Sequence, residues 1–150
     1  MIEKNKELCE KYPFLIPYNE WTGKLDEDWN YEYTWLDDMP TGWRIAFGEQ
    51  MCAEISAALN LLSEEDRKDY RIEQIKEKFG ELRWYSNWTT EEIEKVIDKY
   101  TYLSARTCVK CGKPAEYISK GWICPWCRDC AASLSQSATF VQIDDFFSRT

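Results

Sequence analysis

The stretch TCVKCGKPAEYISKGWICPWCRDCAA, residues 107–132, holds five of the seven cysteines of this 150-residue chain. Cys108 and Cys111 form one C-x-x-C pair, and Cys127 and Cys130 form a second, with 15 residues between the pairs. Two pairs at this separation are typical of a zinc site, because a tight turn across each pair aims two sulfurs at one cation. The sequence therefore predicts that these four cysteines bind Zn²⁺.

The fifth cysteine of the stretch, Cys124, leaves an alternative open. Cys124-Pro-Trp-Cys127 is itself a C-x-x-C pair, so Cys124 could replace Cys130 as a ligand. We favour Cys130, because the sequence AASLSQS follows it and can begin a short helix, which gives the knuckle and helix of a treble-clef-like finger. Cys124 is then either a small packed neighbour or an exposed, oxidisable thiol, and Cys9 and Cys52 are expected to be ordinary packed thiols.

The chain contains no histidine. Catalytic zinc keeps an open coordination position and usually has His ligands, whereas four thiolates close the tetrahedron. We therefore expect one structural zinc ion, whose binding adds to the folding free energy.

The lack of histidine also removes Ser-His-Asp and Cys-His nucleophiles, so we expect a protein that is not an enzyme. The alternative is a metal-independent enzyme that uses carboxylates. Its candidates are Glu91, Glu92 and Glu94, on an expected solvated helix face, and the pair Asp37-Asp38, for which an N-terminal helix cap is the simpler interpretation.

The net charge of −8 is concentrated in the first 65 residues, which carry 14 Asp and Glu against 5 Lys and Arg. Because affinity for nucleic acid depends largely on neutralising phosphates, this balance argues against bulk nucleic acid as a partner. A nucleic-acid-binding zinc ribbon remains an alternative function. The basic residues that could contact phosphates in such a ribbon are Lys110, Lys113, Lys120 and Arg128.

The chain has no apolar run of the length that spans a membrane, and its start lacks the apolar core of a secretory signal. We therefore expect no membrane association and a cytoplasmic location in a bacterial host cell. Thiols stay reduced in that compartment, which favours metal binding over disulfides.

Two segments have the hydrophobic period of helices. Residues 42–62 and 89–106 are predicted to be helical, with Thr41 or Asp38 as the first N-cap and Thr89 as the second. The expected inner faces are Phe47, Met51, Ile55, Leu59 and Leu62 in the first helix, and Ile93, Val96, Ile97, Tyr100 and Leu103 in the second.

Residues 70–88 are ambiguous, since their apolar residues recur at helical spacing while LRWYSNW is rich in strand formers. We favour a β-hairpin that turns near Gly80, with residues 63–69 as a polar connector. The predicted fold is α+β, with two helices packed on a small antiparallel sheet. Residues 1–106 form the core, and residues 107–150 form the four-cysteine finger and a docking C-terminal tail.

Residues 1–41 are predicted to be an irregular, acidic, aromatic arm that drapes over the core. Pro and Gly interrupt this segment, and its aromatic side chains are too frequent for a disordered chain. The expected anchors are Phe14, Trp21, Trp29, Tyr33 and Trp35. In the tail, the expected docking side chains are Phe140, Val141, Ile143, Phe146 and Phe147.

The hairpin segment is also the most ligand-like part of the chain, because rings stack on bases and cations pair with phosphates. The candidate binders of a small nucleotide-type ligand are Lys76, Lys78, Arg83, Trp84, Tyr85 and Trp88. The alternative is an ordinary hairpin with one buried aromatic face and one solvated charged face.

Four blocks together resemble a family of small zinc-finger proteins that are widespread in bacteria, prophages and phages: YPF followed by NEWTG, LDDMPTGWRIAFGEQMCAEI, KEKFGELRWY, and SARTCVKCGKPAEYISKGWICPWCRDCA. The similarity runs from about residue 12 to 131. It implies the same two metal-binding pairs, with Ser or a basic residue frequent at the position of Cys124.

The family resemblance implies a phage or prophage context but no particular activity. The resulting hypothesis is a zinc-stabilised, non-enzymatic binding protein. It would occupy a host protein or sequester a small nucleotide-type ligand, with a role against bacterial defence, and it could form a homo-oligomer.

Overall fold

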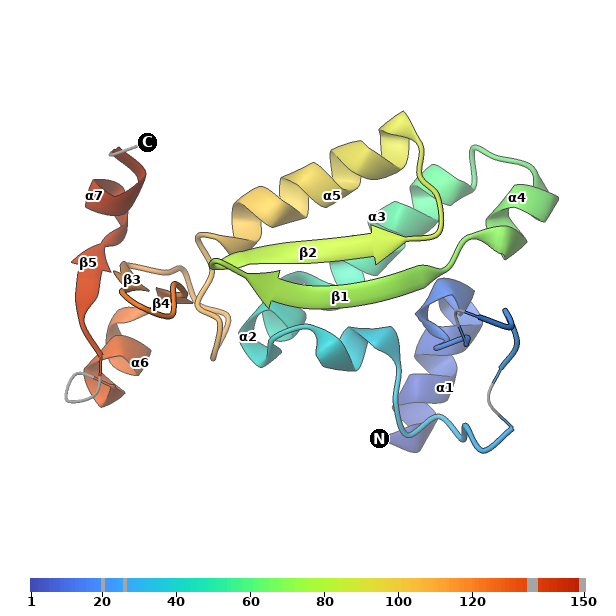
Figure 1. Cartoon of the computed structure of the whole chain (residues 1–150), viewed down its shortest axis with the longest axis horizontal. Helices are drawn as coiled ribbons and strands as arrows, with labels where there is room; N and C mark the ends of the chain where they lie inside the picture. Colours follow the sequence, from blue (N-terminus) through green and yellow to red (C-terminus); the bar gives the residue numbers. More distant parts are fainter. Residues whose placement is uncertain (20, 26, 135–137, 149–150) are drawn as a thin grey trace.

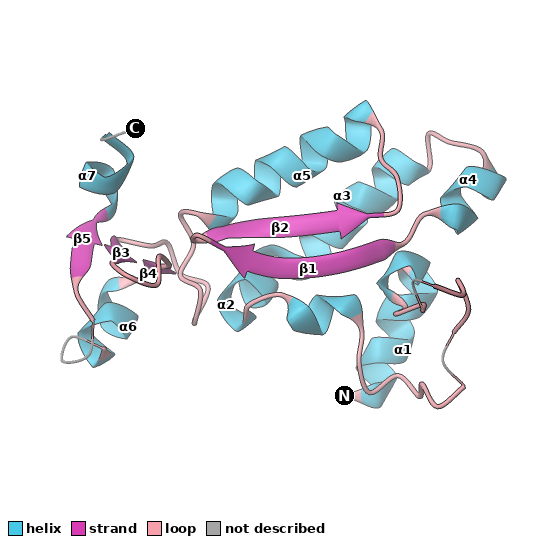
Figure 2. Ribbon diagram, viewed as in Figure 1, coloured by secondary structure: helices cyan, strands magenta, loops and turns pink. Residues whose placement is uncertain are grey.

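The computed structural model describes residues 1–150 except 20, 26, 135–137 and 149–150. Helices and small antiparallel sheets are mixed along the chain (Figures 1 and 2), as predicted for an α+β fold. In chain order the elements are α1 (Ile2–Lys11), η1 (Pro13–Leu15), η2 (Trp35–Asp38), α2 (Thr41–Trp43), η3 (Arg44–Gly48), α3 (Glu49–Leu59), α4 (Glu64–Asp69), β1 (Ile72–Lys78), β2 (Glu81–Ser86), α5 (Glu91–Ser104), β3 (Tyr117–Ser119), β4 (Pro125–Trp126), α6 (Arg128–Ser133), β5 (Phe140–Gln142) and α7 (Ile143–Ser148).

The predicted hairpin is confirmed, with β1 and β2 paired antiparallel across a turn at Phe79 and Gly80. A register irregularity between Ile72 and Gln74 explains why the spacing looked helical. A bulge inserts one extra residue, so that Ile72 and Ile75 both point into the core although they are three positions apart. Helices α3 and α5 lie together behind the hairpin (Figure 1).

The first predicted helix runs from Thr41 to Leu59 as α2, η3 and α3, and η3 is a π-helical turn. The expectation that Thr41 or Asp38 caps it is wrong. Pro40 occupies the N-cap without a side-chain hydrogen bond. The expected inner face is otherwise confirmed, with Phe47, Met51, Ile55 and Leu59 buried and Leu62 packed against the core.

The second predicted helix is α5, and its cap is Thr90 rather than Thr89, because the Thr90 side chain accepts a hydrogen bond from the Ile93 amide. Ile93, Ile97 and Tyr100 are buried as expected. Leu103 is 37% exposed, so its predicted place on the inner face is wrong. Hydrogen bonds tie α5 to β2, because Ser104 Oγ accepts from the Leu82 amide at 2.9 Å.

The N-terminal segment is not irregular throughout, since it begins with α1. The helix buries only Asn5, Leu8 and Cys9, and so short a stripe is easily missed in the sequence. Phe14 is buried, and Trp29 and Trp35 pack against the core as predicted, with Tyr33 half-buried. Trp21, however, is 94% exposed and anchors nothing.

The segment predicted as a polar connector, residues 63–69, is helix α4 instead. Its stabilising features are local. The Ser63 side chain accepts a hydrogen bond from the Asp66 amide, and acidic residues occupy its first turn and basic residues its last. None of its residues is buried, so no hydrophobic period marked it.

A three-stranded antiparallel sheet of order β4-β3-β5 lies at one end of the molecule, beyond the hairpin tip (Figure 1). The C-terminal tail packs on the finger itself, because β5 pairs with β3 and α7 follows it. Arg106 fixes this end, because its guanidinium lies 3.7 Å from the ring centroid of Tyr102 and 4.1 Å from that of Phe147.

Candidate metal centre

The structure brings the four predicted sulfur ligands together. The Sγ atoms of Cys108, Cys111, Cys127 and Cys130 all lie within 4.8 Å of one another, and none is in a disulfide. The Cys111 and Cys127 sulfurs are 3.5 Å apart. A tetrahedral zinc with bonds of about 2.3 Å requires sulfurs roughly 3.8 Å apart, so the cluster has the size of a four-thiolate site.

The first pair lies on a tight turn. The Cys108 amide donates to the Lys113 carbonyl at 2.8 Å, and the Gly112 amide donates to the Cys108 carbonyl at 3.1 Å. Gly112 has φ +86°, a conformation that only glycine adopts without strain. The turn therefore folds the chain back so that both sulfurs face the same side.

The second pair begins helix α6. Cys127 is the N-cap, and its sulfur accepts a hydrogen bond from the Cys130 amide at 3.4 Å. The expected short helix is present, but it starts at Arg128, between the two cysteines, rather than after them. Cys127 is buried and Cys130 is half-buried, so the cluster lies just below the surface.

The electrostatics of the cluster are compatible with a bound cation. Burial raises the pKa of the Cys108 thiol, but hydrogen bonds from backbone amides, that of Cys127 foremost, outweigh burial and lower the pKa to about 7. Burial and hydrogen bonds with the neighbouring thiols raise the pKa of Cys130. Four thiolates cannot all ionise side by side unless a divalent ion offsets their charge, and soft sulfur ligands select thiophilic metals such as zinc.

Cys124 lies outside the cluster. Its side chain is fully buried, and burial, together with the nearby Glu77 carboxylate, raises the pKa of its thiol to about 12. Of the two roles considered for this cysteine, the packed neighbour is the one seen. Cys9 and Cys52 are buried thiols, as expected.

The first turn of the cluster is built directly onto the helical core, which the sequence did not reveal. The Gly42 amide donates to the Val109 carbonyl at 2.9 Å, and the Trp43 indole donates to the Thr107 carbonyl at 2.9 Å. A Cβ atom on Gly42 would lie 2.1 Å from the Cys108 carbonyl oxygen. The two backbones are therefore in direct contact, and the only sequence signal was a glycine within the first helical turn.

The hairpin tip packs on the other side of the finger. A Cβ atom on Gly80 would lie 3.2 Å from the Ile123 carbonyl oxygen. Glu77 joins the two parts, because one oxygen accepts from the Gly80 amide at 2.9 Å and the other accepts from the Trp122 indole at 3.0 Å. The cysteine cluster is thus held between the start of α2 and the hairpin.

The six predicted ligand residues do not gather on one surface. Trp84 is buried and its indole donates to the Tyr70 hydroxyl, so it cannot stack on a base. Trp88 packs edge-on against Tyr70. Lys76 and Arg83 face each other across the strands, beside an exposed Tyr85.

The remaining candidate, Lys78, lies over the Phe79 ring at the turn, with its nitrogen 5.8 Å from the ring centroid. The hairpin has one buried face, made of Ile72, Ile75, Leu82 and Trp84, and one charged outer face, so it is closer to an ordinary hairpin than to a ligand site.

The candidate acidic pair is occupied by structural contacts. Asp37 accepts from the Thr34 amide at 2.7 Å and forms an ion pair with Arg44. Asp38 accepts a hydrogen bond from the Tyr33 hydroxyl. Neither carboxylate caps the N-terminus of α2, and Asp37 instead completes a capping box at η2.

Comparisons of the chain with protein-family models, curated proteins and solved structures find no match. The resemblance to the phage and prophage family therefore stays a prediction. Among the described residues, no helix has both the length and the apolar character needed to cross a membrane.

Proposed function

We propose that this chain is a zinc-stabilised binding protein of phage or prophage type, not an enzyme, and that it occupies a host protein. Its four cysteines would hold one structural Zn²⁺ in a treble-clef-like finger. The observation that carries the proposal is the closed four-sulfur cluster, built by backbone contact onto the start of α2. A metal held there cross-links the finger to the core and leaves no coordination position for a substrate.

The contact surface proposed for the host protein is the tip patch, formed by Phe79 and Trp122. Their side chains are 69% and 64% exposed. They flank the junction at which Gly80 packs on Ile123. Large aromatic side chains are the residues that contribute most to protein–protein binding, and here two of them lie on the surface beside a rigid junction.

The backbone at Phe79 supports this assignment. Phe79 has φ +53° and Gly80 has φ +81°, so the turn has the geometry for which Asn-Gly is the favoured sequence. A bulky residue in the left-handed region costs roughly 1–2 kcal/mol. The ring is exposed and recovers little of that cost through burial. Strain retained at an exposed aromatic residue points to a role outside folding.

The alternatives receive less support from the described residues. Of the four basic residues available to a nucleic-acid-binding finger, Arg128 pairs with Glu116 at 3.0 Å and Lys113 approaches Asp129 at 3.8 Å. The six candidate residues for nucleotide binding do not share one surface, because Trp84 is buried. Occupation of a host protein is therefore the stronger form of the proposal. A role against bacterial defence would follow if that partner belongs to a defence system.

Native mass spectrometry of protein expressed in bacterial cells tests the zinc site. The expected result is one zinc ion per chain in wild type and in Cys124→Ser, and none in Cys130→Ser. Both variants replace one cysteine by serine. Cys124→Ser does so three positions before the proposed ligand Cys127, and Cys130→Ser does so at a proposed ligand, so each variant serves as a control for the other. Zinc retained in Cys130→Ser, or lost in Cys124→Ser, contradicts the ligand assignment.

Affinity purification from phage-infected host cells tests the partner. The bait is wild-type protein, and the matched control is Phe79→Ser, which keeps the four cysteines and the hydrogen bond between Trp122 and Glu77. One host protein should co-purify at fixed stoichiometry with wild type and be lost with Phe79→Ser. Turnover of a nucleotide by the zinc-loaded protein, or a gel shift with random DNA or RNA at low salt, would instead support an alternative function.

A further inference from the structure

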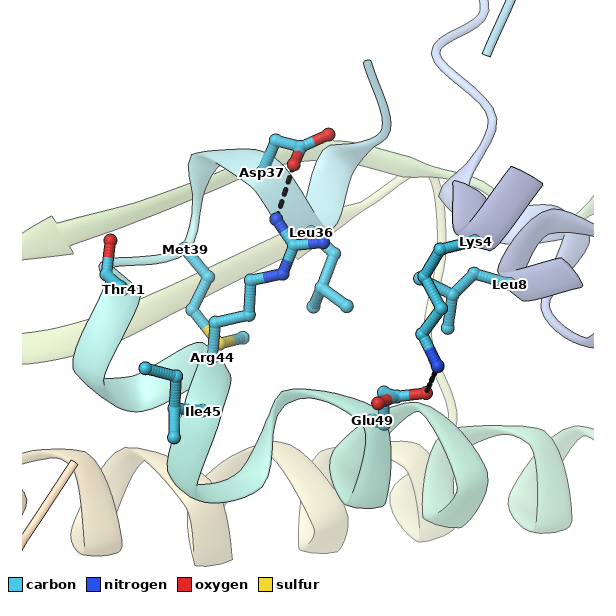
Figure 3. A pocket seen from close by; sticks show the side chains of 9 residues that line it. All are labelled: Lys4, Leu8, Leu36, Asp37, Met39, Thr41, Arg44, Ile45 and Glu49. Carbon is cyan, nitrogen blue, oxygen red and sulfur yellow. Dashed lines mark hydrogen bonds and ion pairs between the residues drawn. The ribbon is translucent and has the colours of Figure 1, made fainter. Parts of the chain in front are cut away.

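A second site is a cavity of about 400 Å³ between α1, η2 and the π-helical turn η3, far along the chain from the four clustered cysteines. Figure 3 shows the side chains that line it. Its apolar lining is Leu8, Leu36, Met39 and Ile45, of which the first three are buried and Ile45 is exposed at the rim. The volume lies within the range of small-ligand pockets in proteins.

Two ion pairs and Thr41 supply the polar lining. Arg44 pairs with Asp37, and Lys4 pairs with Glu49 at 3.1 Å. The Arg44 and Asp37 side chains are about three-quarters buried, whereas Lys4 and Glu49 are more than half exposed. The cavity therefore has one fixed charge pair in its wall and one adaptable pair at its mouth.

Arg44 is held in place from two sides. Asp37, its partner, is itself fixed by the amide of Thr34 at 2.7 Å. Gly48 leaves room for the Arg44 stem, since a Cβ atom there would lie 3.3 Å from Arg44 Cγ. Only one terminal nitrogen of Arg44 points at Asp37, and the other is turned toward the side of Lys4 and Glu49 (Figure 3). Its remaining N–H groups are positioned to bind a carboxylate.

The charges of the lining select the ligand. Lys4 and Arg44 offset Asp37 and Glu49, so the lining has no net charge. A phosphate dianion would meet two carboxylates in a protein of net charge −8. A zwitterion suits both signs, because its carboxylate can bind Arg44 and its ammonium can bind Glu49. The apolar walls would take a hydrocarbon side chain.

We propose that this cavity binds a free apolar α-amino acid, with Arg44 on the carboxylate, Glu49 on the ammonium group and the side chain against Leu36 and Met39. This site is distinct from the proposed zinc site and from the tip patch. The π turn agrees with the assignment, because such turns inside α-helices are frequent at functional sites.

Calorimetric titration and methyl NMR of the zinc-loaded protein test the proposal with four probes: L-leucine, 4-methylpentanoate, isopentylamine and inorganic phosphate. L-leucine should bind about tenfold or more tightly than either half-molecule, since each lacks one charge-assisted hydrogen bond. The methyl signals of Met39 and Ile45 should shift. Absence of leucine binding, equal binding of 4-methylpentanoate, or tighter binding of phosphate each overturns the assignment.

Variants locate the binding. Arg44→Gln should weaken leucine binding about tenfold or more, because the charged fork is lost. Glu49→Gln should weaken it by a comparable factor, because the ammonium group loses its charged partner, and since Glu49 is exposed this variant stays folded. The control is Lys99→Met, which breaks an exposed ion pair with Glu54 outside the cavity. Leucine binding unchanged in both cavity variants places the ligand elsewhere and overturns the proposal.

Discussion

The contact between Gly42 and the first cysteine turn should make Gly42→Ala one of the most damaging small substitutions in this chain. A Cβ atom there would lie 2.1 Å from the Cys108 carbonyl oxygen, 2.6 Å from the Val109 carbonyl carbon and 2.8 Å from the Gly112 nitrogen. All three are backbone atoms, so no side chain can rotate out of the way. The cysteine turn must move away from α2, toward the metal cluster.

The expected cost follows from these distances. Overpacking of this kind costs about 1–3 kcal/mol, and a contact with three backbone atoms belongs at the upper end. The better helix propensity of alanine offsets up to about 1 kcal/mol of this cost, so the free energy of unfolding should fall by roughly 2–3 kcal/mol. For a chain of this size, that loss lowers Tm by roughly 4–12 °C.

Thermal unfolding followed by circular dichroism, with excess zinc and reductant, measures the effect. Gly48→Ala is the matched control in the same continuous helix. Its Cβ atom would meet only side-chain atoms of Arg44 and Leu36 at 3.3 Å, and these can move. Gly48→Ala should stay within about 1 kcal/mol of wild type. If Gly42→Ala unfolds at the same temperature as Gly48→Ala, the cysteine turn does not pack on α2 as described.

Three further outcomes are expected. Phe79→Asn should raise the free energy of unfolding by about 1 kcal/mol in urea denaturation, because Asn accepts a positive φ, while Phe79→Ala should not; equal stabilisation by both would contradict strain at the turn. Removing zinc with a chelator should unfold residues 107–134 first, seen as a loss of amide protection in hydrogen exchange, and uniform protection without metal would count against a structural ion. Between pH 9 and 11 the free energy of unfolding should fall, by at most about 1.4 kcal/mol per pH unit for each group. Burial, the largest cause, raises the pKa of Cys9 to about 11 and of Cys52 to about 12. The folded chain thus keeps these two protons and that of Cys124, all of which the unfolded chain loses above about pH 9, and a flat urea-denaturation series across this range would refute that assignment.

Several elements followed from the sequence because their causes are local. The spacing of Cys108, Cys111, Cys127 and Cys130 is enough to bring four sulfurs together, since each pair needs only a turn or a helix start. The inner faces of α3 and α5 followed from hydrophobic period. The hairpin followed from its strand formers and from Gly80, whose positive φ the turn requires.

Other features depended on contacts between distant segments, and a period or a motif does not encode these. The bulge that places Ile72 and Ile75 on one face, and the burial of Trp84 away from Tyr85, became visible only once the hairpin packed on the helices. The short helix α1 and the exposed helix α4 bury too few apolar side chains to produce a hydrophobic period in the sequence.

The sequence by itself narrowed the metal-binding atoms to the sulfurs of Cys108, Cys111, Cys127 and either Cys124 or Cys130. Tertiary structure decided that Cys124 is buried beside Glu77, that Gly42 packs against the first cysteine turn, and that Arg44 faces a cavity beside Lys4. The physical reason is that ligand chemistry is a property of residue type and spacing, whereas exposure and cavities depend on how elements pack.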